Sequence, residues 1–267
     1  MGGARWRHIC RWRAAPVFMG MMAAGCAAIA QTPAPRLVVP QVMDTKLPST
    51  KLSMASGAAW FATGDSQRIC LWAADDAHFL KSYHLPDALY TAFAVMPGGK
   101  QLAVATSSGI DVLDASDLHA ERHVKLAGRI VWMQGLRNGD LLLATDAELL
   151  RLSAGSDAAQ TMAKLGRSSG NWHFVLGDDE ATLVAFAAEY GEKTNDLTLY
   201  AVGDGAVLWQ KTAASEVEYA AVRGRMVATA RHDATDKQGF NSVLELIDTE
   251  KGTVLELGRK NVRSMAF

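Results

Sequence analysis

Two stretches of the chain gather side chains whose chemistry could support ligand or partner binding. They are EYGEKTND, residues 189–196, and RHDATDKQGFN, residues 231–241. An imidazole beside carboxylates can coordinate a hard or borderline cation, whereas exposed aromatic rings can anchor a partner peptide. The candidate residues for partner binding are Glu189, Tyr190, Glu192, Asp196, Arg231, His232, Asp233, Asp236 and Phe240.

The spacing of these residues favours a partner-binding surface over a metal site. DATD, residues 233–236, lacks the ordered oxygen spacing and the glycine of a calcium-binding loop. The same composition is also typical of solvated hairpin tips. We predict partner binding without a metal, with solvated loop tips and a cation site as the alternatives.

Motifs for catalysis or cofactor binding do not stand out. The chain has no G-x-S-x-G nucleophile elbow, no histidine pair at helical spacing for zinc and no phosphate-binding P-loop. GDGAVLW, which begins at Gly203, matches a nucleotide fingerprint only in its glycines, and no helix is expected to follow it. We therefore predict no catalytic residue and no cofactor.

The elements that must position the candidate residues repeat along the chain. Four short strand-like runs recur in the same order five times, for example LYTAFAV, QLAVATS, IDVLDAS and RHVKLAG between residues 89 and 128. Equivalent first-strand positions are 37 residues apart at Leu52 and Leu89 and 45 residues apart at Trp172 and Val217. A period of about 40 residues with four strands per unit is typical of β-propeller blades. The predicted fold is all-β, a β-propeller of four-stranded antiparallel blades.

In such a fold, the loops from second to third strands emerge at the same end as the connections between blades. The two candidate stretches are the longest second-to-third connections, and they belong to neighbouring blades four and five. We expect them to lie side by side on a rigid scaffold. His173 falls in an inner strand and is a candidate for lining the central channel, whereas His78, His84, His119 and His123 fall at blade edges or turns.

Three segments carry a resemblance to a known family. WFATGDSQRICLWAADD, VMPGGKQLAVATSSGIDVLD and VLELIDTEKGTVLEL resemble the second and third strands, with their turn, of bacterial WD-repeat-like or YVTN-like β-propellers. The resemblance covers residues 36–267. Third strands end in pairs such as Trp72-Ala73 and Leu113-Asp114, and none ends in Trp-Asp. The network of His, Ser or Thr, Asp and Trp that staples blades in the family is therefore not carried over.

The two ends of the repeat region suggest an incomplete ring. NVRSMAF, residues 261–267, matches first strands, so we expect five complete blades plus the first strand of a sixth. RLVV, residues 36–39, is a candidate closing strand. The predicted organisation is a signal peptide over residues 1–30, a linker with the candidate closing strand over residues 31–48, and the propeller over residues 49–267. A complete five-bladed ring is the alternative.

The N-terminal region indicates export. Arg5, Arg7, Arg11 and Arg13 precede a run of apolar and small residues, and Ala28-Ile29-Ala30 fits a signal peptidase site. Lipid attachment at Cys26 is the alternative, which would make the protein an outer or inner membrane lipoprotein. After cleavage only Cys70 would remain, and RICLW predicts that Cys70 is buried. We expect a periplasmic or secreted protein without a membrane span after cleavage.

Composition and charge limit the class of partner. The 267 residues are 49% hydrophobic and carry a formal charge of −1. Scattered Lys and Arg argue against nucleic acid, because phosphate binding needs clustered positive charge. We expect an exported, non-catalytic scaffold that binds a protein or peptide. The alternative, which the family resemblance suggests, is the substrate-recruiting propeller of a larger enzyme such as a peptidase.

Overall fold

The computed structural model describes residues 51–54, 58–64, 67–85, 92–165, 172–187, 195–213, 215–236, 241–262 and 264–266. The chain divides into two units, Met1–Ala34 and Pro35–Phe267, and every described residue belongs to the second unit. The expected signal peptide, the lipid attachment site at Cys26 and the candidate closing strand lie outside the described residues. They stay predictions.

Twenty strands form five four-stranded antiparallel sheets in the part of the chain that the structure describes. The first sheet contains β1 (Lys51–Ser53), β2 (Trp60–Gly64), β3 (Arg68–Ala73) and β4 (Phe79–His84). The second contains β5 (Phe93–Val95), β6 (Gln101–Thr106), β7 (Gly109–Asp114) and β8 (Ala120–Lys125). The third contains β9 (Ile130–Gly135), β10 (Leu141–Thr145), β11 (Glu148–Leu152) and β12 (Gln160–Lys164).

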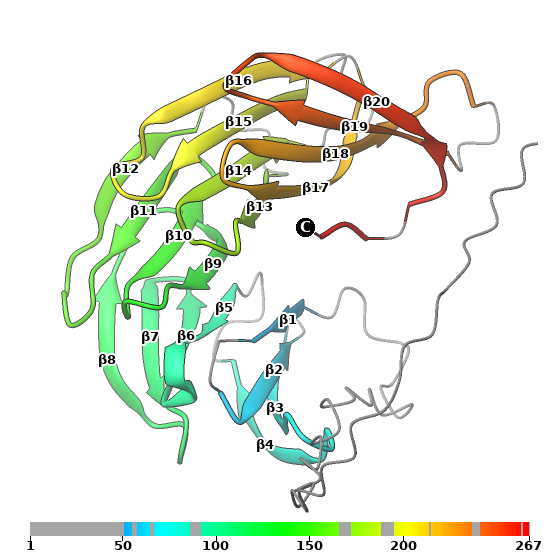
Figure 1. Ribbon diagram of the computed structural model, residues 1–267. Coiled ribbons are helices and arrows are strands. Elements are labelled where there is room, and N and C mark those ends of the chain that lie inside the picture. The colour runs from blue at the N-terminus through cyan, green and yellow to red at the C-terminus, as the bar shows by residue number, and fades with distance from the viewer. Residues whose placement is uncertain are drawn as a thin grey trace, which may run out of the picture. The chain divides into compact units, whose positions relative to one another are not determined.

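The last two sheets follow the same order. The fourth contains β13 (Trp172–Leu176), β14 (Thr182–Ala187), β15 (Asn195–Ala201) and β16 (Val207–Ala213). The fifth contains β17 (Val217–Arg223), β18 (Met226–His232), β19 (Ser242–Asp248) and β20 (Thr253–Lys260). Within the second unit, the sheets succeed one another in chain order, with each first strand innermost and each fourth strand outermost (Figure 1).

Neighbouring sheets pack face to face, which explains why the second strands consist mostly of apolar residues. β10, LLLAT, is buried at every position, because a strand between two packed sheets has no solvated face. Outer strands such as β12 are mostly exposed and carry the polar residues. The five-fold repeat of four strands predicted from the sequence is therefore confirmed for the described sheets.

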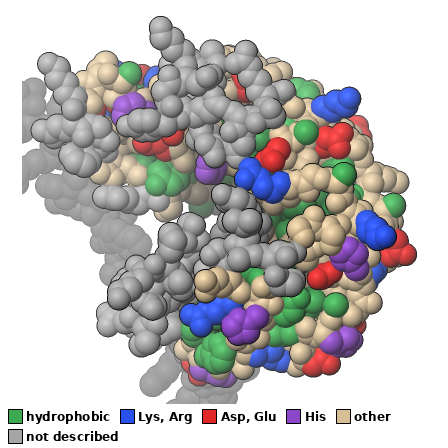
Figure 2. All heavy atoms as spheres, turned by 180° about the vertical axis from the view of Figure 1, so that it is seen from behind, with side chains coloured by type: hydrophobic (Ala, Val, Ile, Leu, Met, Phe, Trp, Pro, Cys, Tyr) green, Lys and Arg blue, Asp and Glu red, His purple; other side chains and the backbone are tan. Residues whose placement is uncertain are grey.

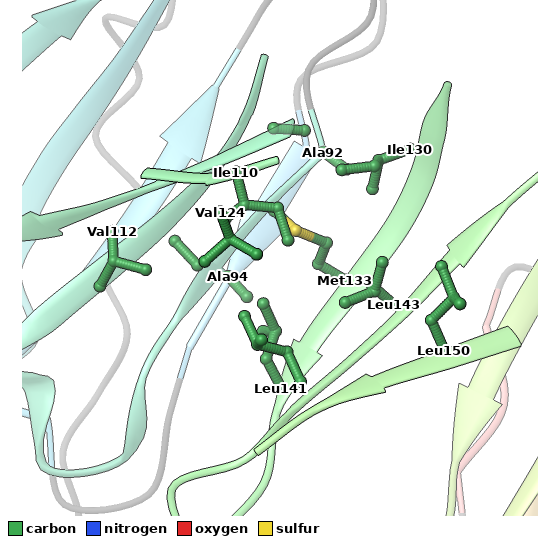
Figure 3. Close-up of a cluster of buried hydrophobic side chains, with 13 residues drawn as sticks. Ala92, Ala94, Ile110, Val112, Val124, Ile130, Met133, Leu141, Leu143 and Leu150 are labelled. Carbon is green, nitrogen blue, oxygen red and sulfur yellow. The ribbon is translucent and has the colours of Figure 1, made fainter. Parts of the chain in front are cut away.

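The hydrophobic core consists of four clusters, one at each seam between consecutive sheets. At the seam between the second and third sheets, Ile110 and Val124 pack with Met133 and Leu141 (Figure 3). Full burial of each such side chain contributes about 1.5–3 kcal/mol relative to exposure. The sheets thus depend on their neighbours, as expected for a repeat protein.

Backbone hydrogen bonds fasten one end of each of the first three sheets. The amides of Leu85, Leu126 and Leu165, which follow the fourth strands, donate to the carbonyls of Gln67, Ser108 and Ala147 between second and third strands. These distances are 2.9, 3.3 and 2.7 Å. The second-to-third connections and the exits toward the next sheet therefore share one end, as predicted.

Turns between third and fourth strands contain two non-glycine residues with positive φ. Ala77 and Leu118 have φ of 56° and 63°, and Gly205 and Gly252 occupy the equivalent position of the fourth and fifth sheets. The amide of His78 donates to Asp76 Oδ1 at 3.0 Å, and His119 repeats this contact with Asp117 at 3.1 Å. These side-chain bonds to the backbone hold the turns, which is the common role of Asp in turns.

The structure differs from the sequence prediction at two places. Asn261, Val262 and residues 264–266 form no strand, so the expected first strand of a sixth blade is absent from the described residues. A strand requires a hydrogen-bonded neighbour, and no described strand pairs with this segment. Cys70 in β3 is half-buried and not fully buried, because β3 belongs to the less covered first sheet.

Exposed large hydrophobic side chains concentrate on the first and fifth sheets or directly beside them. All but Val207 of those in the described residues lie there: Leu52, Met54, Phe79, Leu80, Tyr219, Val254, Leu255 and Leu257. The second and third sheets, which have a neighbour on each side, contain none. The two outermost sheets of the series are thus incompletely covered. Among the described residues, no helix has the length and apolarity needed to cross a bilayer.

Candidate functional site

Five of the nine predicted partner-binding residues lie in the described part of the chain. Asp196 belongs to β15, Arg231 and His232 end β18, and Asp233 and Asp236 lie in the loop that follows. The four candidate residues between positions 231 and 236 lie together at the end of the fifth sheet. The other four, Glu189, Tyr190, Glu192 and Phe240, lie outside the described residues.

Arg231 is held inside the fifth sheet. Its Nε donates to Glu245 Oε1 at 3.0 Å, and its Nη1 donates to the hydroxyl of Ser215 at 3.3 Å. The side chains of Arg231 and Glu245 are only 22% and 13% exposed. An arginine that is paired and covered in this way fixes the connection before β17 and offers little of its charge to a partner.

Asp233 and Asp236 order the loop after β18. Asp233 Oδ1 accepts from the amide and the hydroxyl of Thr235 at 2.9 and 2.7 Å, and Oδ2 lies 3.3 Å from Nη1 of Arg259. These hydrogen bonds from Thr235, followed by the charge of Arg259, lower the pKa of the Asp233 carboxyl. Asp236 accepts from the amide of Asn241 at 2.8 Å. Both carboxylates therefore stabilise the conformation of the loop to which they belong.

The arrangement does not favour the cation alternative at this loop. Among the described residues, the group whose atoms could hold a metal ion is Asp75, Asp76 and His78, which are exposed in a turn of the first sheet. Asp76 Oδ1 already accepts from the amide of His78 and lies 2.5 Å from its Nδ1. That turn geometry accounts for the cluster without a ligand.

His232 remains accessible and lies beside a carboxylate that the sequence analysis did not select. Its side chain is 39% exposed, and its Nδ1 lies 4.0 Å from Oε1 of Glu218, which is 32% exposed. The other oxygen of Glu218 accepts from the hydroxyl of Ser242. Glu218 sits where the register between β17 and β18 shifts, a bulge that redirects its side chain.

Asp196 lies in the neighbouring fourth sheet. It accepts from the hydroxyl of Thr212 at 3.0 Å. Thr212 and Arg231 both line a groove of about 240 Å³ between the fourth and fifth sheets, together with Glu245 and Lys211. That the two candidate stretches lie side by side stays a prediction.

A cavity of about 600 Å³ lies among the innermost strands. It is lined from all five sheets, with Ser53 from β1, Phe93 from β5, Trp132 from β9, His173 from β13 and Glu218 from β17. The placement of His173 at the central channel is therefore confirmed. Sequence reasoning missed the other lining residues, because the alternation along a strand does not show which residues face the centre.

Aromatic rings form much of the cavity wall. Trp132 and Phe174 lie with ring centroids 5.1 Å apart, and His173 stacks on Phe186 at 5.2 Å with an interplanar angle of 16°. The His173 side chain is exposed to the cavity, where desolvation by the surrounding protein lowers its pKa and the charge of Glu216 partly opposes this effect. The neutral imidazole is thus favoured.

On the face shown in Figure 2, the described Lys and Arg side chains are interspersed with Asp and Glu. This face shows no large area of a single charge sign among its described residues. The expectation that nucleic acid is not a partner stays an expectation.

The solved structures that are similar in fold include the following three. Hydrazine synthase from Kuenenia stuttgartiensis matches with a TM-score of 0.60 and 16% identity, over 82% of this chain and 69% of that chain. The WD40 repeats of RRP9 match with a TM-score of 0.57 and 15% identity, over 81% and 68%. U3-55K matches with 0.58 and 14%, over 81% and 69%. No protein-family model and no curated protein matches the chain.

These likenesses define the class of protein as an all-β propeller similar to WD40-repeat propellers. The resemblance to WD-repeat-like propellers is therefore confirmed at the level of fold, whereas nothing confirms a bacterial YVTN-like family. Identities of 14–16% carry no activity from one protein to another. The similar structures include an enzyme as well as WD40 repeats, so function must be argued from the site.

Proposed function

We propose that the protein is an exported, non-catalytic propeller that binds a protein or peptide partner at the end of the fourth and fifth sheets. The observation that carries this proposal is the rigid frame around His232. Arg231, Asp233 and Asp236 are engaged in bonds that fix the loop, while His232 and Glu218 stay accessible. A fixed scaffold with accessible polar groups lowers the entropy cost of binding.

The candidate surface comprises all nine predicted residues, including those outside the described part of the chain. Export rests on the basic and apolar N-terminal run, with the periplasm or the exterior as the destination and lipid attachment at Cys26 as the alternative. WD40-repeat propellers among the similar structures agree with a role in protein interaction.

Selection of peptides from a random library on the folded protein tests the binding surface. Selected peptides should bind the wild type, and His232→Ala with Glu218→Ala should weaken them about tenfold through lost polar contacts. Lys251→Ala is the matched control, because Lys251 lies in the turn between β19 and β20, at the other end of the same sheet. If the selected peptides bound the variant with His232→Ala and Glu218→Ala as tightly as they bind the wild type, the site assignment would be wrong.

We further propose that the propeller contains a sixth blade. Its support is the exposed apolar surface of the first and fifth sheets, which further strands would cover. The same surface favours the alternative in which the propeller serves a larger enzyme, because an adjoining domain could also cover it. Reading the coding DNA beyond the Phe267 codon tests the sixth blade and the adjoining enzyme domain. An open frame with further strand-like repeats supports the sixth blade, whereas a stop codon contradicts it.

A further inference from the structure

The central cavity has the chemistry of a ligand site and shares Glu218 with the loop surface. Its volume of about 600 Å³ is in the range of small-molecule sites. Residues from the innermost strands of all five sheets line it, so its wall is made of strands and not of loops. Such a wall is largely formed before a ligand arrives.

Aromatic faces and edges supply most of the polarisable surface of this cavity. Trp132 lies against Phe174, and His173 lies against Phe186. Tyr219 also lines the cavity and is 36% exposed. The face of an aromatic ring carries a negative electrostatic potential and attracts cations, most strongly in Trp.

The charge of the cavity has a single sign. Glu218 is the one acidic residue among the described lining residues, and none of these is Lys or Arg. The hydroxyl of Ser242 binds one carboxylate oxygen of Glu218, and the β17 bulge sets the direction of the side chain. Nδ1 of His232 lies 4.0 Å from the other oxygen, and His232 itself does not line the cavity.

We propose that the central cavity binds an organic cation, an ammonium or guanidinium group, between its aromatic rings and the carboxylate of Glu218. An anion would meet a carboxylate and no cationic lining residue. A metal ion would find one carboxylate where it needs several oxygen ligands. The cation is either a small quaternary ammonium compound or a basic side chain of a peptide, and the two sources share this chemistry.

Isothermal titration at pH 8.5, with tryptophan fluorescence as a second readout, tests the site on the full chain. The probes are choline, its neutral isostere 3,3-dimethyl-1-butanol and N-acetylarginine amide. We expect at least one of the two cations to bind about tenfold more tightly than the isostere. Binding of choline indicates a small ammonium ligand, and binding of the arginine derivative alone indicates a peptide side chain.

Two variants separate charge from aromatic contact. Glu218→Gln keeps an acceptor for Ser242, and it should weaken the cation about fivefold or more without changing the isostere. Tyr219→Leu removes an exposed ring without disturbing a buried stack. Glu121→Gln on β8 and Phe79→Leu on β4 are the matched controls, and neither residue lines the cavity. Equal affinity for cation and isostere, or an unchanged cation affinity in Glu218→Gln, would overturn the proposal.

Glu218 belongs to both proposed sites, whereas His232 does not line the cavity, so the single variant His232→Ala separates them. Loss of peptide binding in His232→Ala alone, with choline binding retained, would support both sites separately. Choline binding without any selected peptide would support the cavity and contradict the loop surface.

Discussion

The carboxylate of Asp140 accepts a hydrogen bond from Arg151, with 2.7 Å between Oδ2 and Nε. The other oxygen of Asp140 accepts from the amide of Ala154 at 2.9 Å. In the other four sheets, the amide at the equivalent position is bound by a backbone carbonyl, for example that of Ala59 to Ala74 at 2.9 Å. In the third sheet, the side chain of Asp140 therefore replaces the backbone carbonyl that accepts this hydrogen bond at the end of the hairpin in the other sheets.

Replacing Asp140 with Ala should cost about 2–4 kcal/mol of unfolding free energy, because it leaves a half-buried guanidinium and an amide without their acceptor. Denaturant unfolding of the purified protein measures this loss. Asp146→Ala is the control, since its pair with Arg129 is more exposed and should contribute about 0–1 kcal/mol. Equal effects of the two substitutions would contradict the assigned role.

Low pH should destabilise the folded protein by protonating the carboxylate of Asp140. Burial alone would raise the pKa of Asp140, but the amide of Ala154, Arg151 and Asn138 together lower it below 3.8. Because the folded-state pKa is lower than the unfolded one, the stability it contributes is present above 3.8 and is lost as the pH falls through the folded-state value. Unfolding midpoints measured from pH 6 downward should therefore decline less steeply in Asp140→Ala than in the wild type.

A side-chain hydrogen bond joins Trp72 and Thr63 across two strands of the first sheet. The indole Nε1 of Trp72 donates to Oγ1 of Thr63 at 2.8 Å, across the β2 and β3 pair. Thr63→Val keeps the shape but removes the acceptor, so we expect a loss of about 1 kcal/mol. Thr106→Val, at an exposed hydroxyl in β6, should change stability by less. Thermal unfolding of both variants compares them.

The strands could be predicted from the sequence because their signal is local. MVATARH predicts a strand over residues 226–232, and β18 has those bounds. Apolar second strands identify the middle of each sheet for the same reason. The expected strand at the end of the chain was wrong for the described residues, because pairing depends on a partner strand and not on the segment alone.

The candidate site was harder to predict because its contacts are distant in sequence. Nothing near Asp233 indicates that Arg259 will contact its carboxylate. The cavity combines strands from all five sheets, and alternation cannot tell a residue that faces the centre from one that faces a seam. The bulge at Glu218 likewise depends on the pairing of β17 with β18.

Exchanging glycine and alanine at one turn position should produce opposite effects in two sheets. Ala77 has φ of 56°, and Gly252 has φ of 67° at the equivalent position. Relief of left-handed strain, about 1–2 kcal/mol, exceeds the loss of the buried Ala77 methyl group, about 0.8 kcal/mol, so Ala77→Gly should stabilise the protein slightly. Gly252→Ala should destabilise it by about 1 kcal/mol. A Cβ on Gly252 would meet no atom within 4 Å, so the effect there is conformational. Chemical denaturation measures both, and changes of the same sign would rule out this explanation.

His173 should make the protein less stable in mild acid. The ring is exposed to the cavity, but desolvation by the surrounding protein lowers its pKa below 6.5, and the charge of Glu216 opposes this only in part. The unfolded chain then binds more protons than the folded one between the two pKa values, so stability rises with pH across that interval and falls as the pH drops from about 7 toward 5. His173→Gln cannot titrate and should flatten the profile of unfolding free energy in this range. His119 is the matched control, because Asp117 raises its pKa and its contribution should instead be lost as the pH rises. If His173→Gln left the slope between pH 5 and 7 unchanged while His119→Gln altered it, the ring would not be desolvated in the cavity as described.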